Sequence, residues 1–174
     1  MQELELIVDF NGIVVFDPCL LEEFCSGIKF GENLYRRFTT TDDGDKVVEQ
    51  GILVPVLAIN DSIYKVYVRL AHEASPVPSE LIVLSNGDFP FRVRERAMIA
   101  DMAALLEWAP EENWQPLELA AGNYSVCING FRRIENNQII DFGFEIVFSP
   151  CETLPQCTGS LTTSMQVQEF PEPA

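Results

Sequence analysis

Residues 138–148 read Gln-Ile-Ile-Asp-Phe-Gly-Phe-Glu-Ile-Val-Phe, and this stretch indicates the fold class. Alternate apolar residues of the run fall on one face: Ile140, Phe142, Phe144, Ile146 and Phe148. The opposite face is mixed and includes Asp141 and Glu145. A period of two residues is typical of a β-strand, because successive side chains of a strand point to opposite faces. We expect this run to be the longest strand and a central one.

Shorter strand-like runs lie on both sides of this stretch. At the N-terminus, residues 4–10 alternate between apolar and mostly acidic side chains, and Asn11-Gly12 then favours a tight turn, so we expect a hairpin with residues 13–16. The remaining runs span 52–59, 63–70, 81–84, 89–93, 117–119, 124–128 and 131–135. Short strands with turn signals every ~8–12 residues are typical of an antiparallel sandwich or barrel. The sequence therefore predicts a mainly β fold, an antiparallel β-sandwich or open barrel with one or two short helices.

Two segments break the β pattern. Asp17-Pro18 predicts a short helix over residues 18–24, because Asp is a good N-cap and Pro fits the first turn. Residues 96–108 are rich in apolar side chains and contain no Gly or Pro, which predicts a helix of about three turns. By contrast, the acidic run 42–45 follows the β-prone residues 38–41 and indicates a hairpin tip.

The domain organisation is simple. The 174 residues suit a single domain and contain no internal repeat or linker. We expect one β-sandwich domain over residues 1–160. Residues 161–174 are expected to form a C-terminal edge strand or a loose tail, because their prolines cannot join a β-ladder.

The charge of the chain bounds its partners. Eleven basic residues stand against 27 acidic ones, which gives a formal net charge of −16. So few cations disfavour binding to nucleic acid or to an anionic membrane, whereas a basic protein would be attracted. No apolar run approaches the ~20 residues of a membrane helix, and the acidic start does not resemble a signal peptide. We therefore expect a cytoplasmic protein; the oligomeric state is left open.

Cysteine and histidine spacing predicts neither a metal site nor a cofactor. The five cysteines include no Cys-x-x-Cys pair, and the one histidine, His72, lies far from all of them in sequence. We expect Cys127 to be a small buried side chain within an apolar strand, and the other four to be free thiols. Whether any pair forms a disulfide is left open.

Catalytic motifs are missing from the sequence. There is no Gly-x-Ser-x-Gly turn and no phosphate-binding glycine loop, and paired carboxylates are expected by chance among so many acids. We favour a non-catalytic protein. The alternative is an enzyme that uses His72 or a pair of carboxylates.

Two acidic segments are the candidate contacts for a basic partner. They contribute Asp42, Asp43, Asp45, Glu111, Glu112 and Trp114. Trp108 and Trp114 either anchor a partner or a sugar, if exposed, or close the core, if buried. Arg92, Arg94 and Arg96 share one face of an extended strand, and either form ion pairs with the excess acids or line an anion pocket.

Two parts of the chain resemble the ComJ-like competence proteins. They are the opening run, with Glu3-Leu4-Glu5-Leu6-Ile7-Val8 and Val14-Val15-Phe16-Asp17, and the later run from Leu119 to Val126, followed by the strand 139–148. That family includes a small acidic inhibitor of a DNA-entry nuclease. The resemblance covers about a third of the chain and implies a β-sandwich that binds a nuclease.

Three functions therefore remain open at the level of sequence. The first is an acidic, non-catalytic binding protein. One form of it is an inhibitor or immunity-type protein whose partner is a basic protein such as a nuclease. The second is a ligand- or carbohydrate-binding β-sandwich that uses its tryptophans as stacking platforms. The third is the enzyme based on His72 or a carboxylate pair.

Overall fold

The computed structural model describes residues 1–169, which form two β-sheets and a set of short helices. The first sheet has five strands in the order β1 (Gln2–Val8), β4 (Ser62–Leu70), β9 (Gln138–Cys151), β8 (Gly122–Glu135) and β5 (Ile82–Val93). The second has four strands in the order β3 (Leu53–Leu57), β2 (Gly12–Phe16), β6 (Ala97–Asp101) and β7 (Gln115–Leu117). Neighbouring strands are antiparallel except β4 and β9, which are parallel. The prediction of a mainly β, sandwich-like fold is confirmed.

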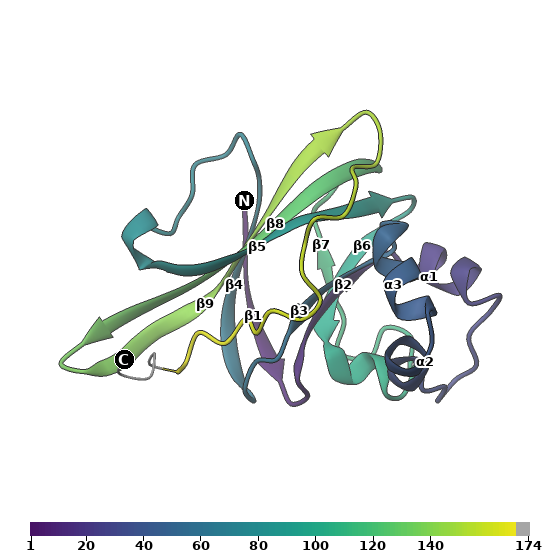
Figure 1. Cartoon of the computed structure of the whole chain (residues 1–174), viewed down its shortest axis with the longest axis horizontal. Helices are drawn as coiled ribbons and strands as arrows, with labels where there is room; N and C mark the ends of the chain where they lie inside the picture. The colour runs from purple at the N-terminus through teal and green to yellow at the C-terminus, as the bar shows by residue number, and fades with distance from the viewer. Residues whose placement is uncertain (170–174) are drawn as a thin grey trace.

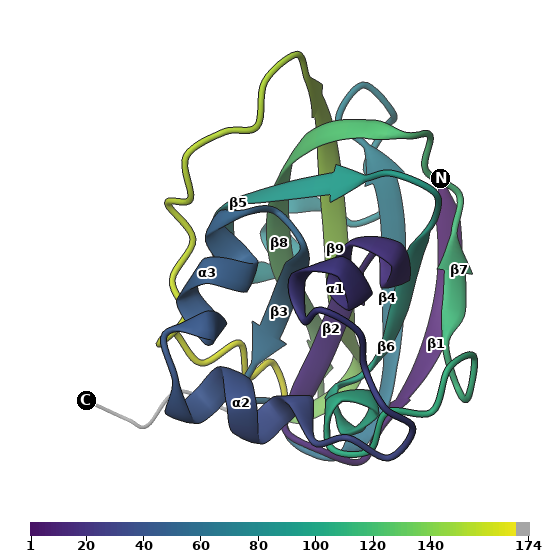
Figure 2. The same cartoon turned by 90° about the vertical axis from the view of Figure 1, so that its right-hand side faces the viewer.

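The three α-helices of residues 1–169 lie on one side of the molecule: α1 (Pro18–Phe24), α2 (Leu34–Thr40) and α3 (Asp43–Glu49). Two 3-10 turns lie elsewhere along the chain, η1 (Ser79–Leu81) between β4 and β5 and η2 (Met102–Leu105) after β6. Figures 1 and 2 show α1, α2 and α3 over the four-stranded sheet, on the face turned away from the five-stranded sheet. The order of layers is therefore helices, four-stranded sheet, five-stranded sheet. This explains why all five residues of β2 are buried, since both faces of the strand are covered.

The core fills the space between the two sheets. The predicted central strand is β9, which has 14 residues and lies in the middle of its sheet, and its Phe144, Ile146 and Phe148 are buried as expected. Aromatic rings from β5 and β8 of the same sheet complete the packing: Phe91 and Tyr124 each lie 5.9 Å, centroid to centroid, from Phe148. Glu145 and Val147 on the opposite face are also buried, so the alternation marks the core-facing side of β9 by its apolar residues and not by a difference in exposure.

The two open sides of the sandwich are closed differently. At the β3–β5 side, the C-terminal segment runs along the gap, where Met165 donates a backbone hydrogen bond to Leu57 and is fully buried (Figure 2). At the β1–β7 side, glutamine side chains bridge the two edges: Gln2 donates to the carbonyl of Pro116 at 2.9 Å, and Gln115 to the carbonyl of Glu5 at 2.8 Å. Side chains rather than a β-ladder thus join β1 to β7.

The helix predicted over residues 18–24 is confirmed with the same bounds. Asp17 caps it by accepting a hydrogen bond from the backbone amide of Cys19 at 2.9 Å. The other carboxylate oxygen of Asp17 accepts from the amides of Arg94 and Glu95. Asp17 is therefore fully buried yet hydrogen-bonded on both oxygens, and it ties α1 to the turn between β5 and β6.

The hairpin predicted around Asn11-Gly12 is wrong. Asn11 does have a positive φ of 57°, as a tight turn requires, but the strands on its two sides enter different sheets. β1 pairs with β4, and β2 pairs with β3 and β6. The reason is burial: β1 has one exposed face, whereas β2 is apolar on both faces and belongs in the doubly covered sheet.

Two predictions about helices are also wrong. Residues 96–108 do not form one helix but contain strand β6 and the turn η2, because a run that is buried on both sides cannot be assigned from its periodicity. Conversely, residues 38–40 and 43–45 belong to helices α2 and α3 rather than to a strand and a hairpin tip, and only residues 41–42 form a turn. Asn33 caps α2 through the amide of Arg36 at 2.8 Å, and acidic residues in the first turn of α3 suit a helix N-terminus. Residues 1–169 therefore contain three short α-helices instead of one or two.

The remaining differences concern strand ends. Residues 82–93 form one strand with a bulge after Asn86, where separate runs were expected over 81–84 and 89–93. Residues 122–135 likewise form one strand through Asn129-Gly130, where separate runs were expected over 124–128 and 131–135. In both places a partner strand or the C-terminal segment covers the polar groups; the side chain of Asn86, for example, exchanges hydrogen bonds with the backbone of Ser160. Of the predicted C-terminal strand or tail, residues 161–169 form no strand, and 170–174 lie outside the described residues.

Candidate binding cleft

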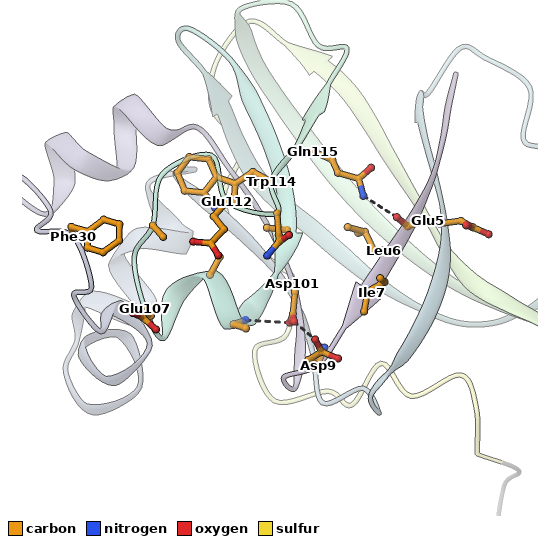
Figure 3. A pocket seen from close by; sticks show the side chains of 15 residues that line it. Glu5, Leu6, Ile7, Asp9, Phe30, Asp101, Glu107, Glu112, Trp114 and Gln115 are labelled. Carbon is orange, nitrogen blue, oxygen red and sulfur yellow. Dashed lines mark hydrogen bonds between the residues drawn. The ribbon is translucent and has the colours of Figure 1, made fainter.

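A cleft of about 540 Å³ opens on the β1–β7 side, directly below the glutamine bridges. Its walls are the second half of β1, the end of β6 with η2, and the loop that leads to β7. The two sheets are joined at Glu5 by Gln115 and again just beyond the end of β1 by Asp101, and Ile7 lies between these two bridges (Figure 3). The cleft is therefore the part of the sandwich interior that neither sheet closes.

Asp101 holds the two walls together at the base of the cleft. One of its carboxylate oxygens accepts a hydrogen bond from the backbone amide of Ala103 at 3.1 Å and caps η2. The other accepts from the backbone amide of Asp9 at 2.8 Å, just beyond the end of β1. Both bonds are drawn in Figure 3. A single aspartate thus fixes the distance between β1 and β6 where the cleft begins.

The floor of the cleft is apolar and well packed. It includes three alanines of β6 and η2, namely Ala100, Ala103 and Ala104, and one edge of Trp114. The indole of Trp114 is 8% exposed, and its ring centroid lies 4.9 Å from that of Trp108 and 5.0 Å from that of Phe16. Because aromatic packing fixes Trp114 and the alanines are short, the floor is rigid and leaves space above it.

Two large apolar side chains stand exposed at the rim. Phe30, between α1 and α2, is 78% exposed, and Ile7 of β1 is 64% exposed. Figure 3 places Phe30 at one end of the cleft and Ile7 at the other, with Glu112 and Trp114 between them. Such exposed side chains around a hollow are typical of surfaces that receive a partner.

The electrostatic character of the cleft is strongly negative. Five acidic residues line it: Glu5, Asp9, Asp101, Glu107 and Glu112. The lining residues within the described chain include no Lys, Arg or His. Negative groups on low-dielectric walls concentrate the field in the hollow, so a cation is attracted there more strongly than to the general surface.

Only part of the predicted acidic contact set lies in this cleft. Glu112 and Trp114 line it, but the neighbouring Glu111 turns away and forms an ion pair with Arg96. The second predicted segment, 42–45, lies at the start of α3 and does not reach the cleft; Asp43 pairs there with Arg37 at 2.7 Å. The structure therefore separates the two predicted acidic segments.

The three arginines of the proposed anion pocket do not converge. Arg94 pairs with Glu23 of α1, and Arg96 pairs with Glu111. Arg92 donates from Nη2 to the backbone carbonyl of Gln50 at 3.1 Å. Each guanidinium faces a different partner, so the arrangement corresponds to the ion-pairing alternative rather than to a pocket.

Sequence reasoning missed most of the cleft. Glu5, Asp9, Asp101 and Glu107 come from strands and turns that are far apart in the chain, and Phe30 comes from a segment with no clear pattern. One signal was available: Phe30 stands in the run Ile28-Lys29-Phe30-Gly31, beside a glycine that favours a loop rather than a core element. The carboxylates gave no such signal, because acids are frequent throughout the chain.

A second polar cluster lies on the outer face of the five-stranded sheet. Glu145 of β9 is 1% exposed and accepts hydrogen bonds from Arg69 at 2.7 Å and Asn129 at 2.9 Å, and also from Ser75. Burial acts to raise the pKa of Glu145, but these hydrogen bonds together hold it below its ordinary value. Since every donor comes from a strand or from the loop over them, the cluster fastens that loop to the sheet.

The other residues singled out from the sequence have plain surroundings. His72 is exposed on the loop after β4 and lines neither this cleft nor the small hollow beside Gln2. The cysteines are free, and Cys127 is half-buried rather than buried; burial raises the pKa of its thiol. Within residues 1–169, no three His, Cys, Asp or Glu side chains lie close enough to hold a metal ion. The α-helices there have seven residues each, too few to cross a membrane.

Comparison with known proteins gives one informative match. No family model matches the chain, and no curated protein does. Among solved structures, a protein described as crocagin biosynthetic gene J is similar, with a TM-score of 0.50 and 16% identity over 85% of this chain and 95% of that one. At that identity the match shows a shared fold.

Proposed function

We propose that this chain is a non-catalytic binding protein that receives a basic segment of a partner protein in the acidic cleft. The observation that carries the proposal is the lining of the cleft, which within residues 1–169 has five acidic residues and no basic one, above an apolar floor. The exposed Phe30 and Ile7 at its ends would pack against the apolar parts of such a segment. A long Lys or Arg side chain suits this mixture, since its aliphatic stem contacts apolar surface and its head contacts carboxylates.

The alternative of a sugar-binding sandwich has lost its main support. It required the tryptophan rings to be exposed as stacking platforms, but Trp108 is 1% exposed and Trp114 is held edge-on in the core. The histidine form of the enzyme alternative required a hollow that contains His72 together with acids, and His72 lines neither hollow. The form that uses a pair of carboxylates stays a prediction, and the mixture of acids and apolar surface in the cleft favours binding over it. Binding of a basic segment is therefore the function that we propose.

Two sources suggest which basic proteins to test. The resemblance to the ComJ-like proteins makes a nuclease the first candidate, with this chain as its inhibitor. The similar fold belongs to a protein named for a biosynthetic gene, so basic components of a biosynthetic pathway are the second candidates, with this chain as an accessory protein. Both share one chemistry, a cationic surface that meets the cleft.

The test uses a defined cationic probe and two variants of equal charge. The probe is a capped synthetic peptide of about nine residues, a common strand length, with Lys and Val alternating. The cleft variant is E107Q/E112Q, and the matched control is D42N/D45N, which removes two exposed carboxylates outside the cleft. Neither pair forms a salt bridge in the structure of residues 1–169, so both variants should fold normally.

The expected result is a difference between variants that net charge cannot explain. At low salt, E107Q/E112Q should weaken probe binding by about three- to tenfold, and D42N/D45N by less than about twofold, because only the former removes charges that touch the probe. Binding should fall steeply as salt is added. Equal losses in both variants would mean that the probe senses only the overall charge, and the cleft would then not be the site. A salt-sensitive partner retained from a lysate by the control variant but not by the cleft variant would identify the natural ligand.

A further inference from the structure

The edge of β1 faces the cleft and is open over a short stretch. β1 is the outermost strand of its sheet, and β7 is the outermost strand of the other. The backbone of Glu5 is occupied by the side chain of Gln115, and the amide of Asp9 by the side chain of Asp101. Between these two bridges lies Ile7, which lines the cleft.

The direction of the Ile7 backbone follows from the pairing of β1 with β4. In an antiparallel pair, alternate residues turn both their N–H and C=O groups towards the partner strand, and the residues between them turn both groups away. The carbonyl of Glu5 and the amide of Asp9 point away from β4, since Gln115 and Asp101 on the far side bind them. Ile7 lies two residues from both Glu5 and Asp9, so its N–H and C=O also point away from β4, into the cleft.

We infer that the basic segment binds as an extended strand added to the outer edge of β1, with its backbone exchanging two hydrogen bonds with Ile7. This inference rests on the proposed function and specifies its binding mode. An added strand satisfies the open N–H and C=O of Ile7, which a helix cannot do because its own backbone groups are already paired. Alternate side chains of the strand would then face the floor beside Trp114 and the outer surface beside Ile7 and Ile63.

Charge determines the nature of the occupant. A second copy of this chain is disfavoured, because each copy carries a net charge of −16 and would bring acids to an acidic cleft. A strand with Lys or Arg at alternate positions places its cations on one face, opposite Asp9, Glu107 and Glu112. The partner is therefore a basic protein with an extended terminus or loop.

The experiment removes backbone hydrogen bonds while keeping side chains and charge. On the protein, I7P deletes the N–H that faces the cleft; proline is tolerated on an edge strand where that N–H does not join the ladder. I7A is the matched control, since it shortens the same exposed side chain but keeps the N–H. On the probe, the alternating Lys/Val peptide is compared with the peptoid that carries the same side chains on nitrogen and has no backbone N–H.

Affinity is measured at low salt by titration, with Trp114 fluorescence as the reporter inside the cleft. Strand addition predicts that I7P weakens peptide binding about tenfold, that I7A changes it less than about threefold, and that the wild-type chain binds the peptoid at least about tenfold more weakly than the peptide. Equal affinity for peptide and peptoid would overturn strand addition and leave the proposed function in place. Binding of neither probe by the wild-type chain would instead refute the proposed function. Should I7P fail to fold, as judged by circular dichroism, the peptoid comparison decides alone.

Discussion

Replacing Arg69 by methionine should strongly destabilise the protein, although the residue lies far from the cleft. Arg69 of β4 donates from Nε to Glu145 of β9 at 2.7 Å, and its side chain is only 13% exposed. It also donates to the backbone carbonyl of Glu73 at 3.1 Å, in the loop that covers the sheet. R69M keeps most of the side-chain volume but removes the cation and all the hydrogen bonds that it donates, including the longer ones to the carbonyls of Leu70 and Ala71.

The size of the effect follows from what Glu145 loses. Removing one partner of a buried ion pair costs about 3–5 kcal/mol, because an uncompensated charge remains inside. Glu145 would keep its hydrogen bonds from Ser75 and Asn129, so we expect the lower end, a loss of about 3 kcal/mol in the free energy of unfolding. For a domain with a total stability of about 5–15 kcal/mol, this is a large fraction.

Urea unfolding measures this loss directly. The buried tryptophans Trp108 and Trp114 report unfolding by fluorescence, and an unchanged slope with urea would show that the folded state is intact. In the wild-type chain the pKa of Glu145 lies below its ordinary value. The cluster therefore contributes its full stability at pH values above the ordinary pKa, and this stability is lost as the pH falls through the lowered pKa of the folded protein. In R69M the unpaired, buried carboxyl should have a raised pKa, so it takes up a proton and loses its charge as the pH is lowered from about 7.5 to about 5.5. The difference in free energy of unfolding between the wild-type chain and R69M should therefore become smaller over this range.

A double variant tests the physical reason. R69M/E145L removes both charges, so it should be more stable than R69M by about 1–2 kcal/mol, even though it lacks one more polar group. If R69M unfolds within about 1 kcal/mol of the wild-type chain at neutral pH, or if the double variant is the less stable of the two, the claim that burial of an unpaired charge dominates is refuted.

Three further outcomes are expected. D17N should lower the free energy of unfolding by about 1–3 kcal/mol in a thermal or urea melt, because the amide nitrogen that replaces one carboxylate oxygen cannot accept the backbone amides bound there; a neutral result would show that this turn is held by other contacts. Burial raises the pKa of Tyr64 to about 12, so unfolding free energy should fall by about 2–3 kcal/mol as the pH rises from about 10 to about 12, and Y64F should lack this component. G143A should destabilise by more than about 3 kcal/mol, because a Cβ there would lie 1.9 Å from the carbonyl oxygen of Lys65 and force β9 away from β4; a stable G143A protein would contradict this pairing.

The sequence by itself determined the class of the fold and its strongest local features. The alternating run from Ile140 to Phe148 identified β9 as a central strand, and Asp17-Pro18 identified α1 with both its ends. Each of these signals is local: a strand with one buried face alternates along its own length, and a cap binds amides two or three residues away. The acidic charge likewise needed only counting, and it led to the proposal of a basic partner.

Only the tertiary structure decided which sheet each strand joins and where the cleft lies. Only residues 9–11 separate β1 from β2, yet the two strands belong to different sheets, because pairing depends on which faces distant strands cover. The same holds for residues 96–108, where burial on both sides made a strand look like a helix. The cleft unites Ile7, Asp101 and Glu112 across a hundred residues of chain, and no local pattern encodes such a meeting. The periodicity of a segment reflects only how that segment itself is buried, whereas a binding site depends on which distant segments pack together.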